Sequence, residues 1–251
     1  MNNKYRTMKM MRKILFVMLI AGTVIVLMFP VAAMISVSLK KAGDVFTMPV
    51  TWLPKVFAFE NYAQVFRKMK IVSGFKASLM ITGMTILFIM IVAIPAAYAF
   101  SGLDFYCKKQ IYYLVLVSQM FAPVIVIIPL YTMMNKMGLI DTWLGLVLMN
   151  TTFNLAFIVL MLKSTFDGVP KEVVEAAKID GCSPFMVMTR IFLPVSSTGI
   201  AVAVIFAFTR TWNEFLFAFT FISTTEKKPV IVSLYEILKN NPAIGIPWHY
   251  V

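Results

Sequence analysis

The chain has 251 residues, of which 60% are hydrophobic and 14% are charged. Soluble domains carry roughly a quarter charged residues, so this composition excludes an ordinary water-soluble globule. The formal net charge is +12, but the basic residues stand between long apolar runs, which favours contact with lipid headgroups and argues against nucleic acid as a partner. The composition predicts an integral membrane protein.

Five apolar runs are long enough to cross a bilayer as helices, since roughly 20 helical residues cover about 30 Å of hydrocarbon. Four runs contain no Asp, Glu, Lys or Arg, and the fifth contains Arg210 and Glu214. We expect spans near residues 14–39, 77–103, 110–135, 142–162 and 195–223. Because backbone polar groups must be satisfied internally in lipid, these runs predict an all-α polytopic bundle in a single transmembrane domain, residues 1–251.

The first run indicates how the chain is oriented. It is too long for the apolar region of a signal peptide and no small-residue cleavage site follows it, so we expect a retained helix. Five basic residues precede this run, against Lys40 and Lys41 directly after it, which predicts that the N-terminus is in the cytoplasm. Counted over all loops, this topology places eleven basic residues on each side of the membrane. Under this topology Cys107 and Cys182 lie in cytoplasmic loops, where no disulfide is expected.

The segment between the fourth and fifth runs, residues 167–194, reads as two short helices joined by a tight turn. Pro170 suits the first turn of a helix, and Gly181 permits a left-handed turn after it. Ser183 can cap the second helix, with Pro184 at its first position.

The first of these helices carries a face of small residues. Val173, Ala176 and Ala177 share one side at i, i+3 and i+4 spacing. Two alanines there let another surface approach closely, so the face predicts a socket for a cytoplasmic partner. The alternative, a helix pair resting on the membrane surface, would favour larger apolar residues.

A family resemblance rests on this same segment. Glu175-Ala176-Ala177 is followed at fixed spacing by Gly181, Ile191 and Leu193-Pro194. The pattern resembles the EAA loop of bacterial ABC import permeases, in which this loop is the coupling helix that contacts the ATP-binding subunit. The resemblance implies that Glu175, Ala176, Ala177 and Gly181 make that contact here.

Other short motifs narrow the resemblance to the maltose-type carbohydrate permeases, and to their smaller, six-span subunit. These motifs are Glu60-Asn61-Tyr62, Gly138-Leu139-Ile140-Asp141-Thr142 and Trp212-Asn213-Glu214-Phe215. The resemblance implies import of a sugar or oligosaccharide through the bacterial inner membrane. It implies as partners two ATPase subunits that bind ATP and Mg, a second homologous permease and an extracellular solute-binding protein. Such permeases continue into a sixth span after a sequence like Pro247–Tyr250, whereas this sequence stops at Val251. Either the sequence is incomplete, which we favour, or the sixth span is absent.

Candidate residues of the translocation path lie in the fifth run. Arg210 and Glu214 stand four residues apart, which predicts a mutually neutralising pair on one helical face, and Asn213 between them can hydrogen-bond a sugar. Charged residues within spans usually face a bundle interior or a wet cavity. The alternative is that both merely snorkel to the headgroups.

Enzymatic chemistry finds little support. The sequence has no phosphate-binding G-x-x-x-x-G-K-[ST] loop, and its one histidine, His249, is not accompanied by metal ligands. We therefore expect neither a cofactor nor a metal bound by this chain. Two alternatives stay open: an ABC importer for another class of solute, and a secondary transporter, which would favour ionisable residues near the midplane and an internal repeat.

Overall fold

The computed structural model of the chain describes residues 2–45, 51–54, 56–68 and 71–239. These residues form helices and connecting turns, with no strand among them, which confirms the all-α prediction. The chain divides into two compact units, Met1–Lys70 with Leu234–Val251, and Ile71–Ser233. Pro247, His249 and the point where the sixth span was expected lie outside the described residues.

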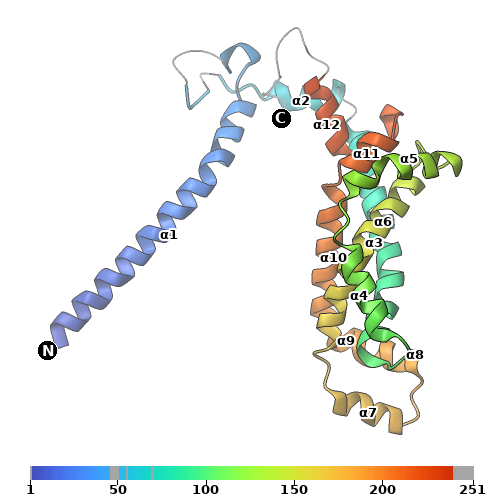
Figure 1. The fold of residues 1–251 in the computed structure, drawn as a ribbon. Helices are drawn as coiled ribbons and strands as arrows, with labels where there is room; N and C mark the ends of the chain where they lie inside the picture. The colour runs from blue at the N-terminus through green and yellow to red at the C-terminus, as the bar shows by residue number, and fades with distance from the viewer. Residues whose placement is uncertain (1, 46–50, 55, 69–70, 240–251) are drawn as a thin grey trace. The chain divides into compact units, whose positions relative to one another are not determined.

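The first unit begins with one uninterrupted helix, α1 (Asn2–Ser38), which contains Pro30 without a break (Figure 1). It is long and apolar enough to cross a membrane over Met8–Ser38. Large apolar side chains are exposed along it, among them Leu15, Val26 and Ile35. A helix that is apolar on all sides fits a lipid or protein environment rather than water.

The motif at residues 60–62 lies at the start of α2 (Glu60–Lys68), and its side chains form hydrogen bonds to the end of α1. The Asn61 side-chain amide donates to the carbonyl oxygens of Ser38 and Lys40, at 2.9 and 2.8 Å. The Tyr62 and Ser38 hydroxyls are hydrogen-bonded at 2.8 Å. Carbonyls at the end of a helix have no partner within it, so the motif closes α1 and anchors the chain that follows.

The second unit is built on three helices that lie side by side (Figure 1): α3 (Ile71–Gly102), α6 (Trp143–Phe166) and α10 (Ser197–Trp212). Their shared core contains four fully buried alanines at i, i+4 spacing, namely Ala93 and Ala97 on α3 and Ala203 and Ala207 on α10. Small residues allow helix backbones to approach closely in membrane proteins. The four alanines therefore allow the backbones of the helices in this bundle to pack closely.

Helices α6 and α10 come close together at Gly199. A Cβ atom added to this glycine would lie 2.2 Å from Thr165 Cγ2. The contact therefore depends on the absence of a side chain at Gly199.

Two of the five predicted spans are not continuous helices. The run at residues 110–135 forms α4 (Lys108–Ser118), the short η2 (Pro123–Val126) and α5 (Ile127–Lys136), with a bend of 86° between its halves. Among the described residues three helices are long and apolar enough to cross a membrane, or up to five if each bent pair is one span.

The second bent pair includes the end of the expected coupling segment, residues 184–194. Pro184–Val195 meets Ser197–Trp212 at 82°. The first part comprises α8 (Pro184–Val187), the π-helical η3 (Met188–Phe192) and α9 (Leu193–Val195). Pro194 lacks an N–H group and its ring crowds the carbonyl four residues earlier, at Arg190. The π turn lies where this crowding falls and accommodates the proline.

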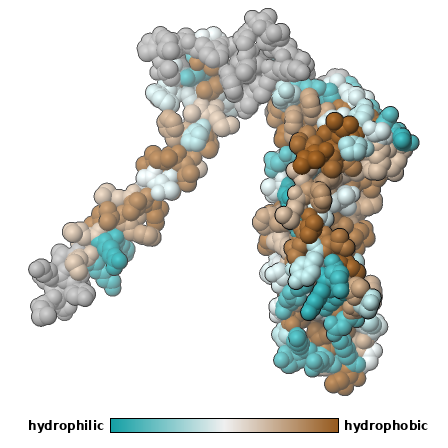
Figure 2. All heavy atoms as spheres, in the orientation of Figure 1, coloured by the Kyte–Doolittle hydropathy of each residue, from teal (hydrophilic) through white to brown (hydrophobic). Residues whose placement is uncertain are grey.

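The predicted span at residues 195–223 is interrupted a second time. After α10 the chain leaves the helix at Asn213 and resumes as α11 (Leu216–Phe221), followed by η4 (Thr225–Lys227) and α12 (Val230–Lys239). Figure 2 shows apolar side chains over much of the bundle surface and hydrophilic ones gathered toward the end that carries α7 (Lys171–Ile179).

Candidate functional site

The two interrupted runs meet at one cavity of about 510 Å³. The break between α4 and α5 contributes Ser118, Gln119 and residues 121–124, and the break after α10 contributes Glu214, Leu216 and Phe217. The remaining lining comes from one side of α6 and from Arg210: Asn150, Thr152, Phe153, Asn154, Ala156, Phe157 and Arg210. Apolar spans thus surround a pocket that has polar side chains and non-helical backbone in its wall.

Glu214 acts as a cap for α11. Its carboxylate accepts hydrogen bonds from the backbone N–H groups of Phe217 and Ala218, at 2.7 and 3.1 Å. These groups have no partner within the helix, so the carboxylate satisfies them and restarts the helix after the break.

Arg210 lies instead over an aromatic ring, with its guanidinium carbon 4.5 Å from the centroid of Phe157. This is cation–π geometry. The predicted ion pair with Glu214 is wrong, because no ion pair joins these two described residues. The reason is the end of α10 at Trp212, which removes the helical i, i+4 spacing that the prediction required. Both side chains nevertheless line the cavity.

Asn213 has a local role at the end of α10. Its side-chain amide donates to the carbonyl oxygen of Thr209 at 2.8 Å, and it is not among the residues that line the cavity. Of the three predicted path residues, the structure brings Arg210 and Glu214 to one cavity and leaves Asn213 beside it.

Two asparagines of α6 were missed by the sequence reasoning. Asn150 and Asn154 are 2% and 7% exposed and stand at i, i+4 spacing in an otherwise apolar run. Their amide groups donate to the carbonyl oxygens of Leu146 and Asn150, but the side-chain carbonyl of Asn150 has no hydrogen-bond partner among the described residues. Buried polar groups are normally paired, so this oxygen is an exception in the packing of α6.

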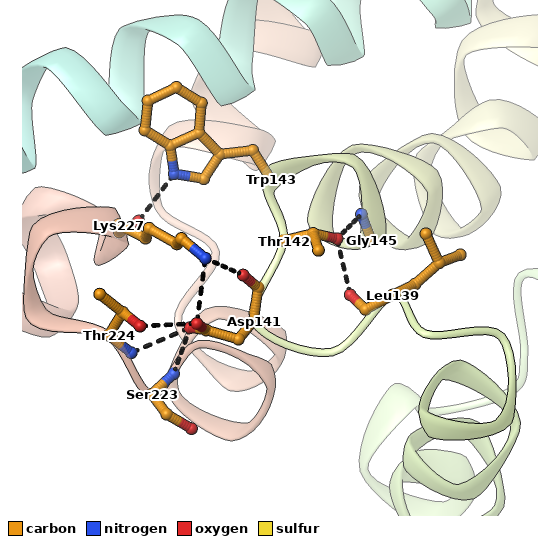
Figure 3. A network of polar contacts seen from close by, with 8 residues as sticks. All are labelled: Leu139, Asp141, Thr142, Trp143, Gly145, Ser223, Thr224 and Lys227. Atoms are coloured by element: carbon orange, nitrogen blue, oxygen red, sulfur yellow. Dashed lines mark hydrogen bonds and ion pairs between the residues drawn. The ribbon is translucent and has the colours of Figure 1, made fainter.

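A dense polar network closes the turn between α5 and α6 (Figure 3), and it explains the motif at residues 138–142. One oxygen of the Asp141 carboxylate accepts from the backbone N–H groups of Ser223 and Thr224, at 3.0 and 2.9 Å. The other accepts from the Thr224 hydroxyl at 2.6 Å and from the Lys227 ammonium at 3.1 Å. The bond from Thr224, with the further bonds from Ser223 and Lys227, holds the pKa of Asp141 well below its ordinary value.

The network extends through Trp143, whose indole N–H donates to the carbonyl oxygen of Lys227 at 3.0 Å (Figure 3). Asp141 itself has a positive φ of 59°, a conformation in which Asp is more tolerated than most residues. The network fastens the start of α6 to the segment that follows α11, and α11 begins in the cavity wall.

At the other end of the bundle, the coupling segment has the predicted local structure. Helix α7 ends at Ile179, Gly181 follows with a φ of +80°, and the Ser183 hydroxyl accepts from the backbone N–H of Met186 at 3.3 Å. Pro184 is at the first position of α8.

The predicted docking face of α7 is partly wrong. Ala177 is 8% exposed and, together with Val174, packs into the bundle's own core cluster, which also contains Val187 and Met188 of the next helical stretch. Glu175 and Ala176 are exposed, as is Gly181. The sequence offers apolar residues on two sides of α7, and contact with the bundle selects the side that holds Val174.

The outward side of this segment holds two large apolar residues that the sequence reasoning did not single out. Ile179 is 86% exposed and Phe185 is 71% exposed, while Val173, a member of the predicted face, is 46% exposed. An exposed apolar group rimmed by charged residues is typical of an interaction site.

Comparison with known proteins identifies the class. Residues 89–236 match the family described as "Binding-protein-dependent transport system inner membrane component", and the chain belongs to this family. The resemblance to bacterial ABC import permeases is therefore confirmed.

Curated relatives and solved structures extend this result. The chain is 31% identical to the sulfoquinovosyl glycerol transport system permease protein SmoH of Agrobacterium fabrum, over 83% of this chain and 74% of that protein. It is 30% identical to the inner membrane ABC transporter permease protein YcjP of Escherichia coli, over 84% and 76%. A crystal structure of a bacterial ABC transporter that imports the acidic polysaccharide alginate has the same fold, with a TM-score of 0.79 at 19% identity, over 95% of this chain and 82% of that one.

Proposed function

We propose that this chain is the substrate-translocating permease subunit of an ATP-driven importer of a sugar or oligosaccharide. The cavity formed where two broken helices meet α6 carries the proposal. The names of relatives support the substrate class, since they include permeases for sulfoquinovosyl glycerol, diacetylchitobiose and trehalose.

The physical properties of the cavity suit a saccharide. Its volume of about 510 Å³ falls within the range of about 300–1,000 Å³ that is usual for small-molecule sites. Non-helical backbone at membrane depth is tolerated where it lines such a cavity, and interrupted helices commonly border the substrate sites of transporters. Asn150, Asn154, Arg210 and Glu214 supply donors and acceptors for hydroxyl groups, beside the rings of Phe153 and Phe157.

We further propose that residues 167–194 couple the bundle to a separate ATPase. Glu175, Ala176 and Gly181 face outward beside the exposed Ile179 and Phe185, and together they present a docking surface. Ala177 acts from the other side of α7, where it seats the helix on the core cluster with Val174. This cluster also contains Leu162 and Phe166 at the end of α6. A displacement of α7 by the ATPase would therefore be passed through these contacts to α6, which lines the cavity.

The proposed assembly contains two ATPase subunits that bind ATP and Mg, a second homologous permease, and an extracellular solute-binding protein. The chain itself binds membrane lipid and no cofactor, and catalyses no reaction. It resides in the bacterial inner membrane as a multi-pass protein with its N-terminus in the cytoplasm, as the five basic residues before the first span, against Lys40 and Lys41 directly after it, support.

Reconstitution of the full complex in liposomes, with the binding protein and ATP, tests the proposal. We expect ATP-dependent uptake of a saccharide, and lower uptake in Asn154→Leu, which removes a polar group from the cavity wall. Thr132→Val is the matched control, because Thr132 is exposed on α5, bonds only within its own helix and is not part of the cavity. Uptake of amino acids or phosphate instead would indicate another solute class, and uptake driven by an ion gradient without ATP would indicate a secondary transporter.

A further inference from the structure

Arg210 carries a positive charge into the cavity without a paired carboxylate. Its side chain is exposed and lines the cavity, and no described carboxylate lies within ion-pair distance of it. Glu214 lines the same cavity, but both of its oxygens are occupied by the first N–H groups of α11. The charge of Glu214 therefore compensates a helix end more directly than it compensates Arg210.

The surroundings of Arg210 hold the guanidinium ready for a ligand. Its position over the Phe157 ring, at 4.5 Å, attracts the cation to an aromatic face and leaves the N–H groups at its edge available. Those groups form a planar fork that matches carboxylate and similar oxyanions in a bidentate manner. Charged residues in membrane segments are costly and are commonly paired with a counter-charge or part of a solute pathway.

We infer that the cavity takes an acidic saccharide, one that carries a carboxylate or sulfonate group, and that Arg210 is the residue that selects it. A neutral sugar would accept hydrogen bonds from the N–H groups of Arg210 but leave its positive charge uncompensated. An acidic group would accept the same hydrogen bonds and also compensate the charge. This inference rests on the proposed saccharide transport and adds the substrate class.

The test uses the reconstituted complex and pairs of saccharide probes. Each pair consists of a uronic-acid di- or trisaccharide and the neutral sugar of the same linkage, made by reduction of its carboxyl groups. We expect the acidic member to be taken up preferentially, and Arg210→Gln to lower its uptake by about 10- to 100-fold, the range for loss of a hydrogen-bonded charge. Arg210→Lys keeps the charge without the fork and should retain part of the preference.

Controls separate selection from other roles of the arginine. Lys136→Gln removes one positive charge from an exposed position on α5, outside the cavity, and should leave the ratio of acidic to neutral uptake unchanged. Affinity of the binding protein for each probe is measured separately, so that only the membrane step is compared. If Arg210→Gln does not assemble, Phe157→Leu decides the matter, because loss of the ring should lower the same ratio.

Several results would overturn the inference. Neutral saccharides transported as well as acidic ones, with no effect of Arg210→Gln on the ratio, would refute it while leaving saccharide import intact. Equal loss of acidic and neutral uptake would show that Arg210 pairs with another subunit. Loss of the mutational effect in liposomes of phosphatidylcholine alone would show that its anionic partner is a lipid headgroup. If no saccharide enters at all, the proposed function fails and the inference with it.

Discussion

Replacement of Asp141 by asparagine should loosen the turn between α5 and α6. The carboxylate accepts four hydrogen bonds, two from backbone N–H groups and two from the side chains of Thr224 and Lys227. Asparagine keeps one acceptor oxygen for the backbone groups and places an amide N–H₂ opposite the Lys227 ammonium, so that bond and its charge assistance are lost.

The expected loss of stability is about 1.5–2 kcal/mol, the lower part of the range for a hydrogen bond to a charged group. The lower part applies because the side chains of Asp141 and Lys227 are still 27% and 43% exposed, and water screens their attraction. For a chain of this length such a loss corresponds to a fall in Tm of about 3–8 °C.

The pH dependence of this effect has a definite sign. The folded state lowers the pKa of Asp141, whereas an unfolded aspartate titrates near about 3.9. The ionised network therefore contributes its full stability above about pH 4 and loses it as the pH falls through the lowered folded value. The difference in Tm between the wild type and Asp141→Asn should be constant at neutral pH and shrink below about pH 4.

Thermal unfolding of the purified protein in detergent, followed by intrinsic fluorescence, measures both quantities. Asp104→Asn is the matched control, since it removes the same charge from a fully exposed side chain that is 3.5 Å from Lys108; such surface pairs contribute little. Equal Tm values for the wild type and Asp141→Asn at pH 7 would refute the reasoning.

Three further predictions concern other parts of the molecule. Gly181→Val should uncouple substrate-stimulated ATPase activity while the helices remain inserted, because its φ of +80° is disfavoured for a β-branched residue although nothing lies within 4 Å of the added Cβ; full stimulation would contradict this. An impermeant thiol reagent applied to intact cells should label neither Cys107 nor Cys182, and labelling of either would overturn the topology. Ala203→Leu should destabilise the bundle by about 1–3 kcal/mol, since Ala203 is fully buried. The control variant Val202→Leu, at a position that is 42% exposed, should unfold at the same temperature as the wild type.

Local rules were sufficient for the segment at residues 167–194. Gly181, Ser183 and Pro184 each favour one backbone conformation at one position, and the structure has a turn, a cap and a first helical residue there. The inward face of α7 was not predictable in the same way. Val173 and Val174 are equally apolar, and only contact with Val187 and Met188 decides which of them is buried.

The interruptions of the predicted spans show a different limit of the sequence. The third run contains Pro123, but one proline in an apolar run does not specify a bend of 86°. The break after Trp212 contains no proline, and the carboxylate of Glu214 within it caps the next short helix, α11. Because the helix is interrupted there, the helical spacing assumed for Arg210 and Glu214 did not apply. Their placement at a common cavity was predictable, because an apolar run contains charged residues mainly where they face such a space.

The two ends of the bundle are fastened by forces of different kinds. Hydrogen bonds and charge hold Asp141 to residues 223–227, whereas burial of Val174, Ala177 and Val187 holds α7 and α8 to the helices above them. Hydrophobic burial weakens on cooling, and the network at Asp141 is not held by burial of apolar surface. Cooling should therefore weaken the packing of α7 and α8 before it weakens the network at Asp141. An assembled transporter would then lose the coupling between its ATPase and the bundle at low temperature, while the turn between α5 and α6 keeps its structure.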